Sequence, residues 1–236
     1  MTGGSPFSYT WTPARPTARG FSTSRTEVVH LTIAFVVLTF DLVLLLSGAG
    51  ALFGYGAKAL EGVSVGLVVV AALAALTGFV GHELAHKLSA QRKGYWAEFR
   101  MSPFGLVISV VSSVLGMLWA APGATVISQM SVADRREWGR TSLAGPLANV
   151  AFGSVFLAAT LLAYHFGSSL YGWLMLLTWF NAWFAAFNLL PFGPLDGAKV
   201  LRWSPAAWFV SILLIGAFAA YATLVLYGFV SPFLGA

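Results

Sequence analysis

Long apolar runs separated by short polar or glycine-rich connections dominate the hydrophobic pattern of the chain. Five runs are long enough to cross a bilayer as helices, and they cover residues 28–49, 64–88, 143–166, 170–190 and 205–230. A further apolar stretch, residues 105–121, is shorter and is interrupted by serines and a glycine. The pattern predicts an all-α polytopic membrane protein with about five to six transmembrane helices and a re-entrant or small β-hairpin segment near residues 95–125.

Composition supports a membrane protein, because 58% of the residues are hydrophobic and only 9% are charged. The net charge of +5 comes from basic residues clustered beside the apolar runs, so we interpret it as a topology signal and not as a nucleic-acid interface. The chain has no cysteine, which excludes disulfides and thiolate metal ligands. Residues 1–27 are polar and predict a tail before a single membrane-embedded domain, residues 28–236.

The most informative polar cluster is His82-Glu83-Leu84-Ala85-His86, at the end of the second apolar run. Two histidines four residues apart on a helix share one face and can bind one metal ion, and the intervening glutamate can act on a metal-bound water. At helical rise the first histidine lies roughly 27 Å along its span, near one edge of the hydrocarbon. The sequence therefore predicts a metal site inside the membrane but close to one surface.

A catalytic zinc generally takes three protein ligands and leaves one position for water. Asp196 is the best candidate for the third ligand, because neighbouring glycine and proline residues would break a helix and let its carboxylate turn inward. Glu98 and Glu137 lie in polar connecting segments, and His165 and Asp41 are further candidates.

Membrane sidedness provides an independent test of Asp196. If His86 and Asp196 bind one ion, the chain must cross the membrane an even number of times between them. Two clear spans satisfy this condition, provided that residues 105–121 do not cross. The same topology puts all 13 basic residues except Lys58 on one side. The positive-inside rule then places the N-terminus and the active site toward the cytoplasm and the C-terminus outside.

Three motifs together resemble the site-2 protease family of intramembrane zinc metalloproteases. They are the stretch from His82 to His86, the Ala-Gly-Pro-Leu-Ala-Asn stretch at residues 144–149, and residues 188–197 with their Leu-Asp-Gly core. The motifs occur in the family's order, each on or beside a membrane span, and the resemblance covers about residues 64–197.

The resemblance implies one Zn²⁺ per chain, held by His82, His86 and Asp196, with Glu83 as the catalytic acid/base. It also implies a substrate-positioning or oxyanion-stabilising role for Asn149. The expected activity is hydrolysis of peptide bonds within or near transmembrane segments of membrane-protein substrates, in the cell membrane. Some members of the family carry a PDZ or nucleotide-sensing module, and the chain has no room for either, so we expect a minimal form.

Several alternatives remain open at this level. A divalent-metal transporter would also place histidines on a membrane helix, and a catalytically silent scaffold could keep the same fold. Asp41 is either a structural hydrogen-bond partner of a neighbouring helix or a catalytic group. His30 and His165 lie near span ends, where an interfacial imidazole is common. The segment 95–108 could supply an edge strand that holds an extended substrate.

Overall fold

The computed structural model describes residues 21–48, 63–127 and 135–228. Most of the predicted polar tail, residues 49–62 between the first two predicted spans and the last residues of the final span lie outside this part of the chain. Within it, four helices are long and apolar enough to cross a membrane. They are α1 (Arg25–Leu46), the continuous helix Val65–Arg92, α6 (Arg135–His165) and α9 (Pro205–Leu226). The continuous helix comprises α3 (Val65–Ala74), a π-helical turn η2 (Ala75–Val80) and α4 (Gly81–Arg92).

The predicted span 170–190 forms α7 (Tyr171–Asn188), which is 18 residues long and runs back along α6. It carries the polar residues Thr178, Asn181 and Asn188 and is not among these four helices. After α7 a short loop leads to α8 (Asp196–Trp203), and Ser204 then caps α9 by accepting from the N–H of Ala207 at 3.1 Å. The predicted helical membrane fold is confirmed.

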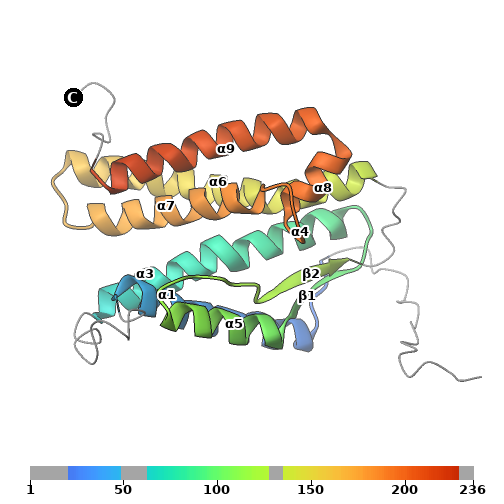
Figure 1. The fold of residues 1–236 in the computed structure, drawn as a ribbon, viewed down its shortest axis with the longest axis horizontal. Coiled ribbons are helices and arrows are strands. Elements are labelled where there is room, and N and C mark those ends of the chain that lie inside the picture. The colour runs from blue at the N-terminus through green and yellow to red at the C-terminus, as the bar shows by residue number, and fades with distance from the viewer. Residues whose placement is uncertain (1–20, 49–62, 128–134, 229–236) are drawn as a thin grey trace, which may run out of the picture.

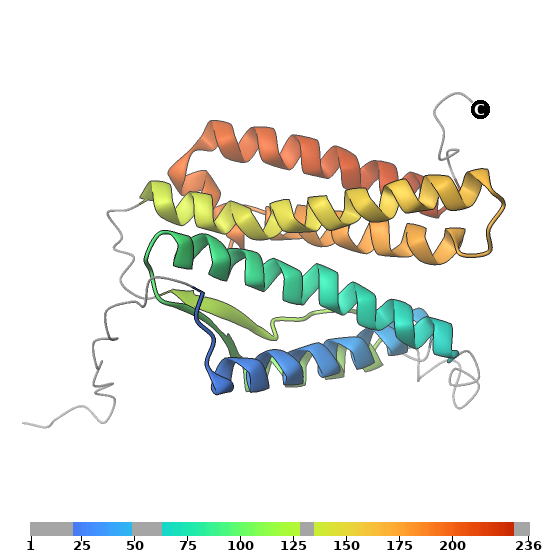
Figure 2. The ribbon, with the colours of Figure 1, turned by 180° about the vertical axis from the view of Figure 1, so that it is seen from behind.

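The helices form two layers, which the two opposite views show from either side (Figures 1 and 2). One layer holds α6, α7, α8 and α9, and the other holds α1, the continuous helix, α5 and a small sheet. The layers meet where α4 packs along α6. The first functional motif lies on α4, so it faces the boundary between the layers.

The predicted hairpin near residues 95–125 is present. Strands β1 (Ala97–Met101) and β2 (Gly123–Ile127) pair antiparallel, with Met101 opposite Gly123, and the short helix α5 (Pro103–Val114) lies between them. Because the residues that open and close the intervening segment are paired, the chain leaves and returns at the same end of the molecule (Figure 1). The segment therefore does not cross from one end to the other, as the topology argument requires.

Small residues allow the helices of each layer to approach closely, as is typical of membrane helices. Alanines with 0–2% exposure line the contact between α1 and the continuous helix, and others line the contact between α7 and α9: Ala34, Ala71, Ala74, Ala75, Ala182 and Ala222. Large apolar side chains point outward from every long helix, among them Val68, Val155, Leu162, Phe209 and Leu213. Small residues inside and large apolar side chains outside are the arrangement expected of a surface that faces lipid.

Buried polar contacts fix α1 against the hairpin and α4. Glu27 and Lys87 form an ion pair that is 0% and 1% exposed at its side chains, and Glu27 Oε1 accepts from the N–H of Phe99 at 3.0 Å. Further along α1, the buried Asp41 accepts from Ser113 Oγ of α5 at 2.9 Å. The structural alternative for Asp41 therefore matches its contacts.

Candidate metal centre

His82 and His86 lie on one face of α4 and turn their Nε2 atoms toward each other, 3.0 Å apart. Asp196, the first residue of α8, brings its Oδ2 to 3.2 Å from His82 Nε2 and 2.9 Å from His86 Nε2. All three residues are buried, with exposures of 2%, 7% and 5%. The potential ligand atoms lie within 4.8 Å of one another, so the structure brings together the three predicted ligands.

The hydrogen bonds around the imidazoles indicate why a cation fits this place. His86 Nδ1 lies 2.8 Å from the main-chain O of Thr141, which can only accept, so this nitrogen carries the proton. His82 Nδ1 lies 2.6 Å from Oδ1 of Asn149, and the Nδ2 of Asn149 donates to the main-chain O of Gly78 at 2.7 Å. When Nδ1 carries the single proton of each ring, both Nε2 lone pairs face the carboxylate of Asp196. Three converging acceptors need a positive charge between them, and two imidazoles with one carboxylate suit zinc.

Asn149 is a fully buried link between α6 and η2. Its side chain accepts from His82 and donates to Gly78, so both polar ends are engaged. Gly78 lies within the π-helical turn directly before α4, and such turns often occur at functional sites because they rearrange main-chain hydrogen bonds. These contacts give Asn149 the task of orienting the imidazole of His82. The oxyanion role expected from the resemblance stays a prediction.

Steric contact with the histidines explains why the Gly145-Pro146 pair of α6 begins with glycine. A Cβ placed on Gly145 would lie 2.5 Å from His86 Nε2 and 2.6 Å from His82 Nε2, so only glycine lets α6 pass this close to the cluster. Pro146 follows inside the helix and has no N–H for the carbonyl of Ser142, the residue after Thr141, whose carbonyl binds His86.

Asp196 reaches the cluster because α7 ends at Asn188 and the chain turns sharply before α8. Gly193 has φ of +62°, a left-handed conformation that favours glycine. Lys199, one turn into α8, donates to Oδ1 of Asp196 at 3.1 Å, which leaves Oδ2 for the imidazoles. Burial raises the pKa of the Asp196 carboxyl, but the charge of His86, hydrogen bonds from both imidazoles and Lys199 together bring that pKa well below its ordinary value. Without a metal, an imidazolium proton can therefore occupy the same place.

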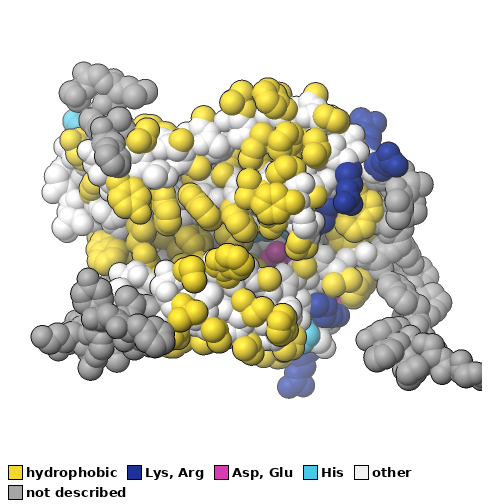
Figure 3. All heavy atoms as spheres, in the orientation of Figure 1, with side chains coloured by type: hydrophobic (Ala, Val, Ile, Leu, Met, Phe, Trp, Pro, Cys, Tyr) yellow, Lys and Arg dark blue, Asp and Glu magenta, His cyan; other side chains and the backbone are white. Residues whose placement is uncertain are grey.

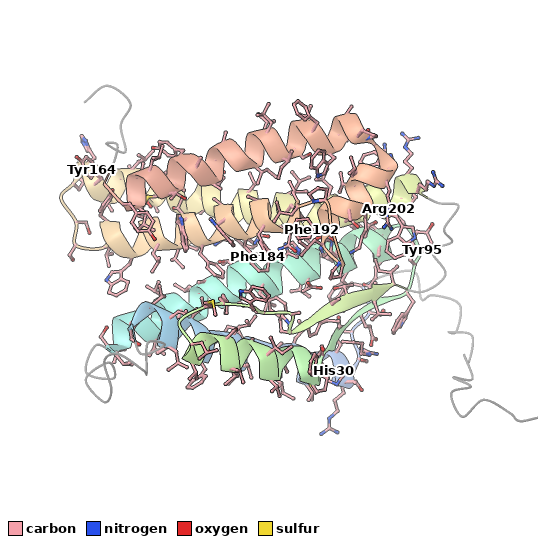
Figure 4. The ribbon with its side chains drawn as sticks, in the orientation of Figure 1. His30, Tyr95, Tyr164, Phe184, Phe192 and Arg202 are labelled. Carbon is pink, nitrogen blue, oxygen red and sulfur yellow. The ribbon has the colours of Figure 1, made fainter. Side chains whose placement is uncertain are left out.

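Glu83 borders the cluster on the hairpin side. Its Oε2 accepts from the main-chain N–H of Thr125 at 2.8 Å, and it lines a cavity of about 160 Å³ together with His82, His86 and Asp196. Phe184 of α7 closes the cavity from the other layer, with its ring 5.3 Å from that of His82, and Figure 4 shows it directed toward α4.

The other candidates for the third ligand lie elsewhere. Glu98 pairs with Arg100 and Glu137 pairs with Lys93, both outside the cluster. His165 ends α6, and Asp41 binds α5. His30 accepts a long contact from the N–H of Met101 at 3.4 Å, also away from the metal ligands (Figure 4). Sequence reasoning did not single out Thr125, Thr141 or Lys199 as site residues. Thr141 acts through its main chain, which leaves no side-chain signal.

Comparison with known proteins agrees with this site. The chain is 35% identical over 199 residues to the "Putative zinc metalloprotease MJ0611" of Methanocaldococcus jannaschii, and the match covers 83% of this chain and 94% of that protein. No family model and no solved structure matches the chain.

The class that the fold and the cluster define is a zinc metalloprotease with membrane-spanning helices. Sequence identity at this level over nearly the whole relative also identifies the family. The chain belongs to the site-2 protease family.

Proposed function

We propose that this protein is an intramembrane zinc endopeptidase that hydrolyses peptide bonds within or near transmembrane segments of membrane-protein substrates. The observation that carries the proposal is the convergence of Asp196 from α8 on His82 and His86, which lie beside Glu83 on a helix long and apolar enough to cross a membrane. Bound zinc would polarise water and the peptide carbonyl. The metal ligands assigned from sequence are the same three residues.

Glu83 is the proton carrier in this proposal. It takes a proton from the attacking water and delivers it to the leaving amine, which requires a carboxylate at the edge of the metal cavity. Asn149 and Thr141 hold the two imidazoles with their Nε2 atoms facing inward. These contacts fix the ring orientations before any metal or substrate binds.

The cavity side of the hairpin offers a place for an extended substrate. In β1 the N–H of Phe99 points to Glu27, and in β2 the N–H of Thr125 points to Glu83, so these paired residues turn their donors away from each other. Glu27 covers the outer edge of β1 at Phe99, whereas the outer edge of β2 lines the cavity, where Glu83 takes the Thr125 N–H. We propose that substrate pairs with β2 and not with the 95–108 segment expected from sequence. Such pairing requires a helical substrate to unwind locally.

Charge supports the orientation proposed from sequence. The space-filling view shows Lys and Arg side chains gathered at one end of the molecule, while hydrophobic side chains cover much of the rest of this face (Figure 3). The same end carries Arg202 of α8 and Tyr95 before β1 (Figure 4). We propose that this end faces the cytoplasm in the cell membrane. Lys58, the predicted exception, lies outside the described residues.

The test is cleavage of a single-span membrane protein by purified, zinc-loaded enzyme in detergent and in liposomes. Glu83→Gln should abolish cleavage and keep about one zinc per chain, because a glutamine cannot carry the proton. Cleavage retained by Glu83→Gln would refute the mechanism. Zinc transport into liposomes without peptide hydrolysis would favour the transporter alternative. In the described residues, however, His82, His86 and Asp196 form the one cluster that could hold a metal ion.

A further inference from the structure

Thr125 of β2 contacts Glu83 of α4 at several points. Its main-chain N–H donates to Glu83 Oε2 at 2.8 Å, and its Oγ1 lies 2.8 Å from the same oxygen and 3.0 Å from the main-chain O of Glu83. The hydroxyl has one proton and can donate to either acceptor. One carboxylate oxygen of Glu83 is therefore fixed by a residue about forty positions away, on a different element.

This contact matters because a glutamate side chain is flexible. A general base must lie within hydrogen-bond reach of the proton that it abstracts, and a free glutamate would populate several rotamers. Binding of Oε2 by Thr125 leaves Oε1 for the attacking water. Glu83 and Thr125 both line the cavity that holds the metal cluster, so the fixed carboxylate stays at its edge.

We propose that Thr125 is a positioning residue for catalysis, through which the hairpin holds the proton carrier in place beside the metal site. The inference rests on the proposed role of Glu83. It gives the hairpin a second task besides substrate pairing: β2 aligns the general base. A purely structural Thr125 would instead only attach β2 to α4.

Two substitutions separate these roles. Thr125→Val removes the hydroxyl at nearly constant volume, and Thr125→Ser keeps it. With the zinc-loaded enzyme and one single-span substrate, Thr125→Val should lower kcat about three- to tenfold, because one hydrogen bond to a charged acceptor is lost while the main-chain donor remains. KM and zinc content should stay near wild type, and Thr125→Ser should restore kcat.

Thr160→Val is the control, because the Thr160 hydroxyl also bonds a main-chain carbonyl and a side chain, Phe156 O and Thr178 Oγ1, but within the other layer. Its kcat should equal that of wild type. A Thr125→Val enzyme with wild-type kcat, or a Thr125→Ser enzyme as slow as Thr125→Val, would overturn the positioning role. Either result would leave the proposed function intact if Glu83→Gln is inactive. An active Glu83→Gln enzyme would refute the proposed function instead.

Amide hydrogen exchange of the metal-free protein gives a readout without activity. Glu83→Ala removes the acceptor of the Thr125 N–H, so exchange at this amide should accelerate roughly tenfold. Glu137→Ala, which removes a partner of Lys93 elsewhere, should leave this exchange rate unchanged. Unchanged exchange in Glu83→Ala would show that Glu83 does not hold this amide, and the inference would fail.

Discussion

Gly145→Ala tests whether close packing of α6 against α4 keeps the metal ligands in place. The added Cβ would lie 2.5 Å from His86 Nε2 and 2.6 Å from His82 Nε2, whereas ordinary contact begins near 3.4 Å. The overlap of about 0.9 Å can be relieved only if α6 moves away or the imidazoles turn. Turned imidazoles move their Nε2 atoms away from Oδ2 of Asp196, and a displaced α6 withdraws the Asn149 and Thr141 acceptors that orient the rings.

The magnitude follows from two opposing effects. Overpacking of this kind typically costs about 1–3 kcal/mol, and replacing glycine by alanine inside a helix returns up to about 1 kcal/mol. If the imidazoles turn to relieve the overlap, they must turn back before they can bind metal, and the free energy of this movement reduces zinc affinity. About 1.4 kcal/mol corresponds to a tenfold loss of affinity. We therefore expect zinc affinity to fall at least about tenfold while the helical fold persists.

The assay is competition between the purified protein and a chelator of known zinc affinity, with helix content followed by circular dichroism. Gly216→Ala is the matched control, since nothing lies within 4 Å of a Cβ at that position in α9. It should bind zinc like wild type. Wild-type zinc affinity in Gly145→Ala would refute the reasoning, because it would mean that the ligands do not depend on the approach of α6.

Three further changes test the ligands and their support. Asp196→Ala should lose stoichiometric zinc in metal analysis, whereas Glu98→Ala should keep it; the reverse result would relocate the third ligand. Asn149→Ala should weaken zinc about 10–100-fold in the chelator assay, since His82 loses its orienting acceptor; unchanged affinity would argue against that task. Glu27→Ala should destabilise the protein by about 3–5 kcal/mol, because it leaves Lys87 buried without its charge partner, and adding Lys87→Met should recover most of the loss in thermal unfolding. Equal stability of both variants would contradict this.

Helical periodicity and membrane sidedness made the metal ligands and the hairpin predictable from the sequence. His82 and His86 share a face because they lie four residues apart, and Asp196 was placed beside them by counting crossings between charged ends. The hairpin near 95–125 followed from the same count, and β1 and β2 confirm it. Hydropathy also located the long helices, although α7 is not among the four that are long and apolar enough to cross a membrane.

Contacts between distant elements could not be predicted in the same way. Sequence suggested segment 95–108 as the strand for substrate, and it could not indicate that β2 lines the cavity, because strand pairing and the position of Glu27 decide which edge faces the cavity. The contacts of Asn149 that link His82 to the π-helical turn had no sequence signal, and its substrate-positioning or oxyanion role stays a prediction. Thr125 carries no sequence signal at all.

The sequence by itself determined that the chain forms membrane helices and that His82 and His86 can share a metal, because both follow from hydropathy and from spacing within one helix. Only the tertiary structure decided how those residues are held. The inward lone pairs of His82 and His86 depend on acceptors from α6, and the carboxylate of Glu83 depends on a donor from β2. Such hydrogen bonds require a few tenths of an ångström of precision between segments far apart in the chain, and only packing of the helices and the hairpin supplies it.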